Sequence, residues 1–154
     1  MASSTEFANI RIPSNIKLDH NPNVITLLRC FSEIICNRPV DGATLNSRIA
    51  EFVHPDYHQE TNGNMLNFDQ LVSHIRALTE VTAHMTVTFN RIVAKNDRIA
   101  MFHHAQAEKK DGSHISGDVI AILGFRDGRI ATCYECAEIS SDDPSDQDLI
   151  LRTE

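Results

Sequence analysis

Histidine side chains are the strongest candidates for chemistry in this sequence. His103 and His104 are adjacent in a strand-like run, and they belong to a set of eight histidines among 154 residues. Successive side chains of a strand point to opposite faces, so one of the two should face the interior. A histidine in an apolar pocket stays neutral and can act as a base near neutral pH. In the alternative interpretation, one histidine covers the core and the other lies in a subunit contact.

A base of this kind works best beside a group that holds the substrate oxygen. Tyr57 and Asp118 are the candidates, because a tyrosine hydroxyl can polarise a carbonyl oxygen and a carboxyl group can move a proton. The alternatives are structural. Tyr57 could fill space with its hydroxyl in water, and Asp118 could be a solvated acid at the start of a strand.

Several other side chains are candidates to line such a pocket. His74 interrupts an apolar helical stripe, so it borders either the cavity or the edge of the core. Tyr134 and Glu135 are neighbours in a strand and should not both line one cavity; Tyr134 is the predicted ligand contact of the two. If aromatic rings fill the pocket, the domain has a structural role instead. The rings that we expect at the pocket are Phe31, Phe68 and Phe102.

Metal and redox chemistry are not indicated by the cysteines and histidines. Cys133 and Cys136 form a C-x-x-C pattern, but they lie in a predicted strand, where positions three apart face opposite ways. The four cysteines are therefore expected to be free thiols. His54 and His58 are four apart, but Pro55 disrupts the helix that would bring them together. We expect no metal ion and, because the six glycines form no phosphate-binding loop, no cofactor.

Four strand-like runs in the second half of the chain must position these residues. Tight polar turns separate them at Asn96-Asp97, Lys110-Asp111-Gly112 and Asp127-Gly128, and these residue types tolerate the positive backbone angles of short hairpins. Consecutive hairpins predict an antiparallel meander. The four runs are Met85–Lys95, Ile99–Glu108, Ile115–Phe125 and Arg129–Ile139.

The first half has the apolar spacing of helices. His20-Asn21-Pro22-Asn23 is a helix entry signal in which an asparagine can act as the cap, and Asn37-Arg38-Pro39 ends that helix. A short second helix follows, and a third begins at Asn67 or Asp69. Between the second and third helices, residues 57–61 are expected to form a short extended segment. Helices followed by a curved sheet predict an α+β fold with a pocket that opens at one end. The apolar stripes are Val24, Leu27, Leu28, Phe31, Ile34 and Ile35, then Leu45, Ile49, Phe52 and Val53, then Phe68, Leu71, Val72, Ile75 and Leu78.

Size and charge narrow the function classes. The chain of 17.3 kDa is long enough for one domain with its own core. Its net charge is −7, with 14 Lys and Arg scattered against 21 Asp and Glu, so nucleic-acid binding is not indicated and an anionic membrane would repel it. No apolar run approaches the roughly 20 residues of a membrane span. The start of the chain lacks the features of a signal peptide, so we expect a cytoplasmic protein.

The predicted domain organisation has three parts. Residues 1–20 form an N-terminal arm, residues 21–140 form the domain that carries the pocket, and residues 141–154 form an acidic C-terminal tail. The arm has no sustained apolar period, and the tail ends in a small apolar patch at Leu149, Ile150 and Leu151.

Four segments, in this order, resemble a known family: Phe52–Glu60, Phe68–Leu71, Val93–Ala100 and Phe125–Ile130. With the helices and the meander, they resemble the cone-shaped fold of the nuclear transport factor 2 superfamily, and most closely its SnoaL-like polyketide cyclase branch. The resemblance covers about residues 22–139. It implies three N-terminal helices packed on a curved, mainly antiparallel sheet.

The resemblance also implies a function and a site. Members include cofactor-independent cyclases, isomerases and dehydratases that act on carbonyl compounds, and domains that only bind ligands. This sequence differs from the family pattern at three places. Ala121 stands where catalytic members place an acid, and Gln59 or Glu60 lies near the place of a family histidine. Tyr134 takes the place of a family tryptophan. The implied ligand is a small hydrophobic molecule, and Gln59 is a predicted contact to it.

Three hypotheses remain open from the sequence. The chain could be an enzyme for a small carbonyl compound, a binding module without turnover, or a domain that forms a homodimer through the outer face of its sheet, where Ile120 and Ile122 alternate. The polar content of the pocket distinguishes the first two. Two or more titratable groups near one point favour an enzyme, and a single polar group in an apolar cavity favours binding.

Overall fold

A curved seven-stranded sheet forms the framework of the molecule in the computed structural model, which describes residues 7–17, 21–39, 41–149 and 152. Its largest part is the predicted meander, four long strands paired antiparallel in chain order. These strands are β4 (Thr82–Lys95), β5 (Arg98–Lys109), β6 (His114–Arg126) and β7 (Arg129–Ser140). Positive φ angles at Asn96, Gly112, Asp127 and Gly128 confirm the three predicted turns.

Two strands from the first half extend the sheet beyond β7. β2 (Val53–Thr61) pairs parallel with β7, and β3 (Asn64–Asn67) pairs antiparallel with β2. At the other edge, β1 (Ile10–Arg11) pairs parallel with β4. The predicted extended segment at residues 57–61 is therefore the second half of β2. The strand order across the sheet is β1-β4-β5-β6-β7-β2-β3.

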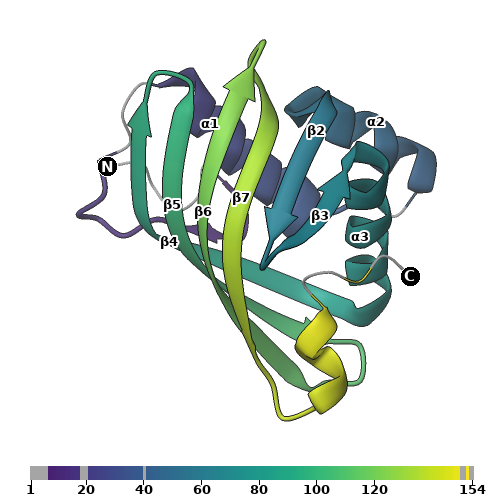
Figure 1. Cartoon of the computed structure of the whole chain (residues 1–154). Helices are drawn as coiled ribbons and strands as arrows, with labels where there is room; N and C mark the ends of the chain where they lie inside the picture. The colour runs from purple at the N-terminus through teal and green to yellow at the C-terminus, as the bar shows by residue number, and fades with distance from the viewer. Residues whose placement is uncertain (1–6, 18–20, 40, 150–151, 153–154) are drawn as a thin grey trace.

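Three helices cover one face of this sheet (Figure 1). They are α1 (Pro22–Cys30), α2 (Gly42–Phe52) and α3 (Phe68–Val81), and α1 continues into a wider π-helical turn, Phe31–Cys36. Asn21 caps α1, and Asn67 and Gln70 form a reciprocal capping box at α3. The predicted helices and the cone-like α+β fold are therefore confirmed.

The core lies between the helices and the concave face of the sheet. Phe89 of β4 is fully buried and packs edge-on against Phe31 of the π-helical turn, with 5.2 Å between the ring centroids. Leu27 and Leu28 of α1, Ile49 of α2 and other apolar side chains complete it. Burial of these side chains is the main favourable term for folding.

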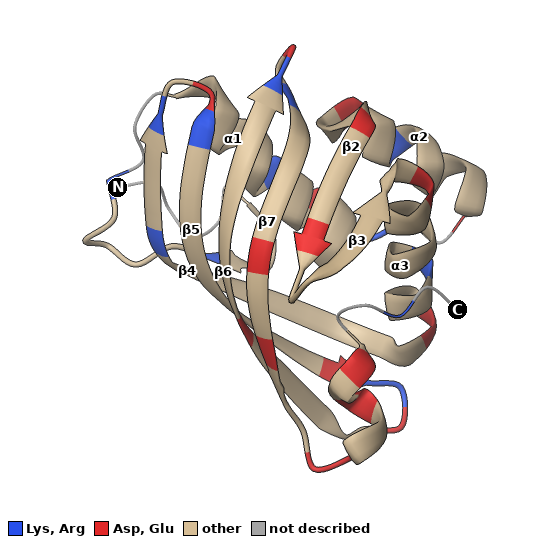
Figure 2. Ribbon diagram, viewed as in Figure 1, with Lys and Arg blue, Asp and Glu red and all other residues tan. Residues whose placement is uncertain are grey.

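Parts of the predicted arm and tail pack on this core. Phe7 and Ile10 are buried, and residues 1–6 and 18–20 lie outside the described residues. At the other terminus, a 3-10 helix, Pro144–Asp148, follows β7, and Leu149 is buried. Ile150 and Leu151 of the predicted apolar patch lie outside the described residues. Figure 2 shows acidic residues gathered near this C-terminal turn.

The described helices include none that is both long and apolar enough to span a bilayer. The longest, α3, has 14 residues and a polar face. A span of the hydrocarbon core takes roughly 20 apolar residues.

A close contact at Gly124 gives a test of the β6–β7 pairing. The register between these strands shifts at Gly124 and Phe125, and a Cβ atom on Gly124 would overlap Oγ1 of Thr132. We expect Gly124→Ala to lower the free energy of unfolding by about 1 to 3 kcal/mol, because Thr132 must leave its rotamer or the strands must separate. Urea denaturation measures the change.

The matched background for this experiment is Thr132→Ala, which removes the overlapping oxygen. In that background, Gly124→Ala should have a clearly smaller effect. An equal loss of stability in both backgrounds would show that the overlap with Thr132 is not its cause.

Candidate functional site

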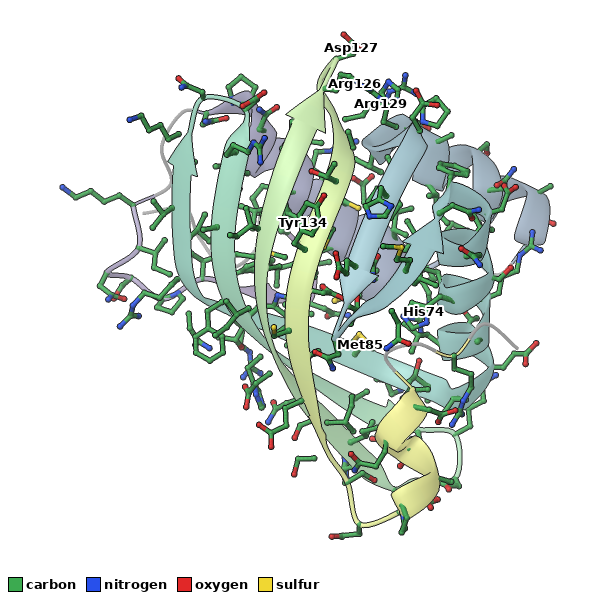
Figure 3. All side chains as sticks on the ribbon, viewed as in Figure 1. His74, Met85, Arg126, Asp127, Arg129 and Tyr134 are labelled. Carbon is green, nitrogen blue, oxygen red and sulfur yellow. The ribbon has the colours of Figure 1, made fainter. Side chains whose placement is uncertain are left out.

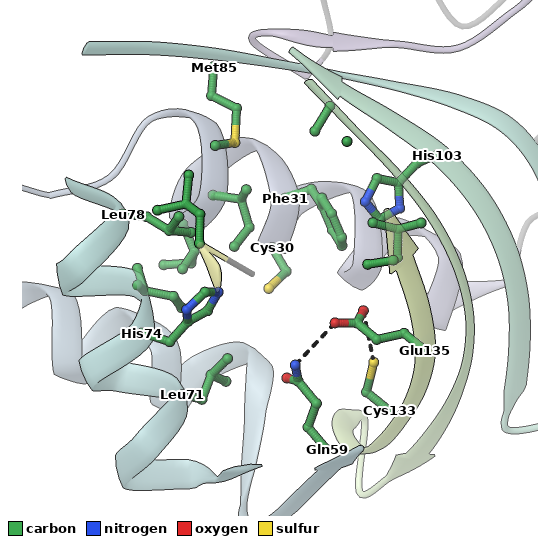
Figure 4. A pocket seen from close by; sticks show the side chains of 18 of the residues that line it. Cys30, Phe31, Gln59, Leu71, His74, Leu78, Met85, His103, Cys133 and Glu135 are labelled. Atoms are coloured by element: carbon green, nitrogen blue, oxygen red, sulfur yellow. Dashed lines mark hydrogen bonds between the residues drawn. The ribbon is translucent and has the colours of Figure 1, made fainter. Parts of the chain in front are cut away.

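A cavity of about 220 Å³ lies between the concave face of the sheet and the helices. Figure 4 shows His74 and Leu78 of α3 facing His103 and Glu135 of the sheet across this space. Most of the wall is apolar, with contributions from the π-helical turn, α3 and the inward side chains of β5, β6 and β7. The polar and thiol side chains on the wall are Cys30, Tyr57, Gln59, His74, Thr82, His103, Ser116, Cys133 and Glu135.

A hydrogen-bonded network of side chains from β2 and β7 forms one end of the cavity. Oε1 of Glu135 accepts hydrogen bonds from Oγ1 of Thr61 at 2.7 Å and from Nε2 of Gln59 at 3.1 Å. Its other oxygen accepts a weaker bond from Sγ of Cys133 at 3.6 Å (Figure 4). Two firm bonds on one oxygen therefore fix the carboxyl group.

The parallel pairing of β2 with β7 explains why these residues meet. In its register, Thr61 is beside Glu135 and Gln59 is beside Cys133. Residues 57, 59 and 61 alternate along β2 with one exposed or half-buried residue between each pair, so all three side chains point inward. The network thus comes from strand alternation on two neighbouring strands.

Tyr57 belongs to the same network through Gln59. Its hydroxyl donates a hydrogen bond to Oε1 of Gln59 at 2.6 Å, and this orients the amide so that its N–H group points toward Glu135. The hydroxyl proton of Tyr57 is therefore already used within the protein. Burial raises the pKa of Tyr57 well above its usual range, so the group stays a neutral donor.

The carboxyl group of Glu135 has an altered proton affinity. Its removal from bulk water raises the pKa of Glu135, while the bonds from Thr61 and Cys133 act in the opposite direction. A carboxylate with a raised pKa is a stronger base than an exposed one, and perturbed groups of this kind gather at functional sites.

His103 lies on the wall of the same cavity and is 5% exposed. Its ring packs edge-on against Phe31 at 5.0 Å between centroids, and it also contacts Phe89. Burial, followed by the nearby His104, lowers the pKa of His103 to about 4, with Asp118 acting in the opposite direction. Among the described residues, none hydrogen-bonds Nδ1 of this ring.

His103 and Glu135 project from the same face of the sheet. They lie on β5 and β7, with β6 between them, and the register places Val119 beside His103 and Ala121 beside Glu135. Two strand spacings separate their backbones by about 10 Å across the sheet. Both side chains can therefore reach one small molecule in the space above Val119 and Ala121.

His74 faces the cavity from α3 and is held by the C-terminal segment. Its Nδ1 lies 2.7 Å from the carbonyl oxygen of Arg152, and burial lowers its pKa. Leu149 of the same segment lines the cavity and is buried. The last described part of the chain therefore closes one side of the cavity.

An ion pair fixes this closing segment to the sheet. Asp146 is 2% exposed, and both its oxygens accept from Nζ of Lys109, at 3.0 and 3.2 Å. The hydroxyl group of Ser141 donates a third bond to it at 2.6 Å. We expect Asp146→Ala to raise amide hydrogen exchange in residues 144–149, because the unpaired Lys109 no longer anchors them. Hydrogen–deuterium exchange by mass spectrometry measures this change.

Asp142, exposed in the same segment, provides the control. Asp142→Ala should leave the exchange of residues 144–149 as it is in the unaltered chain. If Asp146→Ala behaves like Asp142→Ala, the ion pair with Lys109 does not hold the segment.

The cavity brings together some of the site residues predicted from the sequence. His103 and Tyr57, of the predicted catalytic set, lie on its wall, as do Gln59, His74 and Phe31 of the predicted ligand contacts.

Other predicted residues lie elsewhere. His104 and Asp118 form a pair on the opposite, outer face of the sheet, with Nδ1 and Oδ1 2.7 Å apart. Tyr134 is 45% exposed on that face (Figure 3), so its neighbour Glu135 is the inward one. Phe68 and Phe102 are half-buried and are not part of the wall. The cavity is therefore not filled by the three phenylalanines.

Sequence reasoning missed the role of Glu135, Thr61 and Cys133. Strand alternation does require Glu135 to face away from Tyr134, and it places Glu135 on the same side as Cys133, which is buried two residues earlier. Ile130 has the parity of Tyr134 and is buried as well, so alternation from the apolar residues of this strand did not decide between the two. Thr61 could not have been linked to Glu135, because a parallel pairing across 74 residues leaves no local trace.

The cysteines follow the predicted pattern. All four are free, and Cys133 is buried while Cys136 is exposed, in agreement with opposite faces of one strand. Burial raises the pKa of Cys30 to about 12 and that of Cys133 well above its usual range, so neither thiol is a nucleophile. In the described part of the chain, no three His, Cys, Asp or Glu side chains are arranged to hold a metal ion.

Comparison with known families identifies the class of protein that this fold and cavity define. The SnoaL-like domain family matches residues 43–133, which is more than half of the chain. The chain belongs to this family, and the resemblance stated from the sequence is confirmed.

Individual relatives agree with this assignment. An uncharacterised protein of Schizosaccharomyces pombe is 31% identical over 109 residues, which cover 71% of this chain and 84% of the relative. A Jannaschia sp. protein provisionally named a SnoaL-like polyketide cyclase has a similar structure, with a TM-score of 0.59, 15% identity, and coverage of 90% of this chain and 100% of its own. An LEH-like epoxide hydrolase of M. tuberculosis has a TM-score of 0.59, 13% identity, and coverage of 84% and 89%. At these identities, the two structures show a shared fold.

Proposed function

We propose that the cavity binds a small, largely apolar carbonyl compound and that the protein is a cofactor-independent enzyme that moves a proton next to the carbonyl group. The observation that carries this proposal is the pair formed by Glu135 and His103. One is a fixed carboxyl group with a raised pKa, and the other is a buried neutral imidazole on the same face of the sheet. Two titratable groups that can reach one ligand favour catalysis over simple binding.

In the proposed reaction, Glu135 is the base. Its carboxylate takes a proton from the carbon next to the carbonyl, the C–H electron pair forms the enolate, and Glu135 becomes a carboxylic acid. Thr61 and Gln59 hold Oε1, so the oxygen that has only the weak thiol contact is the one free to take the proton. Return of the proton from Glu135 to a different carbon completes an isomerisation. In a dehydration, the enolate electrons form the C=C bond, the C–O bond to a β-hydroxyl group breaks, and that oxygen takes the proton from Glu135 and leaves as water.

In this reaction, His103 stabilises the oxygen of the enolate. A neutral imidazole carries one N–H group, and a pKa of about 4 keeps His103 neutral at pH 7. A donor placed at a developing oxyanion contributes about 10² to 10³ in rate. Tyr57 acts through Gln59 as a positioning residue, because its hydroxyl orients the amide that holds Glu135.

The names of structural neighbours support a small-molecule reaction. They include the provisionally named polyketide cyclase and the LEH-like epoxide hydrolase described above. The proposal for this chain rests on its own residues, since one fold hosts many functions.

Exchange of protons with heavy water tests the proposed enzyme. The probe is 2-tetralone, a compact, apolar ketone with acidic protons next to its carbonyl group. We expect the protein to accelerate the loss of these proton signals in proton NMR spectra relative to buffer. His103→Ala should reduce the rate, and His104→Ala on the outer face should not. If the protein accelerates neither this exchange nor that of smaller and larger cyclic ketones, it is not this kind of enzyme.

A binding module without turnover is the second candidate. The bonds to Glu135 from Gln59, Thr61 and Cys133 would equally fix it as an anchor for a ligand. In that case, 2-tetralone binds, as chemical-shift changes would show, but its protons exchange at the rate of buffer.

We also propose a homodimer formed through the outer face of the sheet. Val93, Ile122 and Tyr134 are 67%, 51% and 45% exposed, and the register places them in one row across β4 to β7, with Ala100 between the first two. Ile120, 62% exposed, lies beside this row. Clustered exposed apolar side chains are typical of protein interfaces.

Ile122→Lys tests this interface, because it places a charge at the centre of the row. Light scattering after size-exclusion chromatography should give the mass of two chains for the unaltered protein and of one for the variant. Glu108→Lys, an exposed change elsewhere, should stay dimeric. A monomer before any substitution would rule out the proposed dimer. The cytoplasmic location also stays a proposal, supported by four free thiols.

A further inference from the structure

The imidazole of His103 has a hydrogen-bonding atom without a partner. Nδ1 is fully buried, the side chain is 5% exposed, and none of the described residues bonds this atom. Buried polar groups in folded proteins almost always have a partner. Because Nδ1 is enclosed, a molecule in the cavity cannot reach it. The ring nitrogen that such a molecule can meet on this wall is Nε2, which also has no hydrogen bond from the described residues.

The charges of the wall restrict what that molecule can be. Its described residues include one carboxyl group, Glu135, and two imidazoles, His74 and His103, but no lysine or arginine. Burial lowers the pKa of both histidines, so neither provides a positive charge at pH 7. An anionic group in this cavity would lose its water and meet Glu135 without a cation to pair with.

The volume restricts the size of the molecule. At the packing density of protein interiors, a cavity of 220 Å³ holds about twelve non-hydrogen atoms. This is the size of a compound with two fused six-membered rings and one substituent. It is far smaller than a nucleotide or a coenzyme A thioester.

We infer that the cavity selects an uncharged, compact apolar compound with one hydroxyl or keto oxygen that hydrogen-bonds to His103, and that it rejects the corresponding carboxylates and phosphates. This inference rests on the proposed function, because it requires that the cavity binds a small molecule. It goes beyond that function by naming the charge, the size and the recognised group of the ligand. The tautomer of His103 decides which of the two oxygens is preferred, since a bare Nε2 accepts a hydrogen bond from a hydroxyl group and a protonated Nε2 donates one to a ketone.

Four naphthalene-type probes of matched shape test the inference. They are 2-naphthol, 2-tetralone, naphthalene and 2-naphthoate, and isothermal titration calorimetry measures their dissociation constants. We expect the better of the two oxygen compounds to bind about tenfold more tightly than naphthalene, the effect of one hydrogen bond. We expect 2-naphthoate to bind at least about a hundredfold more weakly than that compound. Which of 2-naphthol and 2-tetralone binds more tightly shows which tautomer His103 adopts.

His103→Leu links the preference to the proposed contact. In this variant, the tenfold advantage of the oxygen compounds over naphthalene should disappear, while naphthalene still binds and thereby shows that the cavity is intact. His103→Asn, which restores a polar atom, should recover part of the advantage. His104→Leu, on the opposite face of β5, is the matched control and should keep the full preference.

Three results would overturn the inference: 2-naphthoate binding as tightly as the neutral probes, His103→Leu keeping the preference for oxygen, or no binding of any probe. These outcomes are distinct from failure of the proposed enzyme. Binding with the expected order but without proton exchange would leave the inference intact and overturn the catalytic proposal. Proton exchange together with tight binding of 2-naphthoate would leave the catalytic proposal intact and overturn the inference about the ligand.

Discussion

Replacing Glu135 by Gln is expected to slow proton exchange of 2-tetralone by about 10² to 10⁴ and, at neutral pH, to make the folded protein more stable. The loss of activity follows from the loss of the base, because an amide oxygen does not take up a proton in this pH range. The shape of the network is kept. The amide oxygen of the new side chain can accept from Thr61 and Gln59 as Oε1 does now, and its NH₂ group then lies near Cys133.

The gain in stability follows from the raised pKa of Glu135. When a carboxyl group has a higher pKa in the folded state, the unfolded chain loses the proton first as the pH rises. The folded state is then disfavoured from the ordinary pKa of glutamate, near 4.3, up to the folded pKa, and the penalty stays constant above it. Glu135→Gln removes this penalty, so its advantage should be absent at pH 4 and present at pH 8.

Urea unfolding at the two pH values measures this difference. Glu138→Gln is the matched control, since Glu138 is exposed on the same strand, and it should change neither exchange nor stability. A Glu135→Gln variant with full exchange activity would exclude Glu135 as the base. Opposite changes in activity and stability are expected where a half-buried carboxyl group is kept for its chemistry.

Local chemistry in the sequence was sufficient to predict the meander and the helix starts. Asp127 and Gly128 tolerate the positive φ angles of a short hairpin, and Asn67 can cap a helix through its own side chain. Signals of this kind depend on a few neighbouring residues, so they can be recognised in a single sequence. The four-residue strand β3 carries too few residues for a pattern, and it was not predicted.

Local signals of this kind could not decide which of His103 and His104 faces the cavity. Alternation requires one inward and one outward ring, but it chooses between them only if one face of the strand is apolar. Here both faces are apolar, since Met101 lies on the inner face and Phe102 on the outer one, which also carries Ile120 and Ile122. The sequence therefore left the choice open.

The network around Glu135 depends on contacts that are distant along the chain. Thr61 and Gln59 reach Glu135 only because β2 pairs parallel with β7, and β2 follows a helix instead of a hairpin turn. Parallel pairs need long connections, whose residues do not encode the register. Half of the candidate site could thus be found from alternation and composition, and the other half required the structure.

Acidification from pH 6.5 to pH 4 is expected to lower the free energy of unfolding by about 3 kcal/mol through His103 alone. The ring has a pKa of about 4 in the folded protein because burial disfavours its charged form, and of about 6.5 in the unfolded chain. Between these values, the unfolded chain binds a proton and the folded protein does not. Stability is therefore complete above pH 6.5 and is lost as the pH falls toward 4.

Comparison with His103→Leu isolates this contribution, since His74 also has a lowered pKa and adds a loss of the same sign. Urea unfolding between pH 4 and pH 7 should show a smaller dependence on pH in the variant than in the unaltered chain. His104→Leu, on the outer face, should retain most of the dependence. Equal pH profiles for His103→Leu and the unaltered chain would mean that this imidazole takes up its proton as freely when folded as when unfolded. It would then take up its proton near its ordinary pKa in the folded state, and burial would not be what keeps it neutral in the proposed reaction.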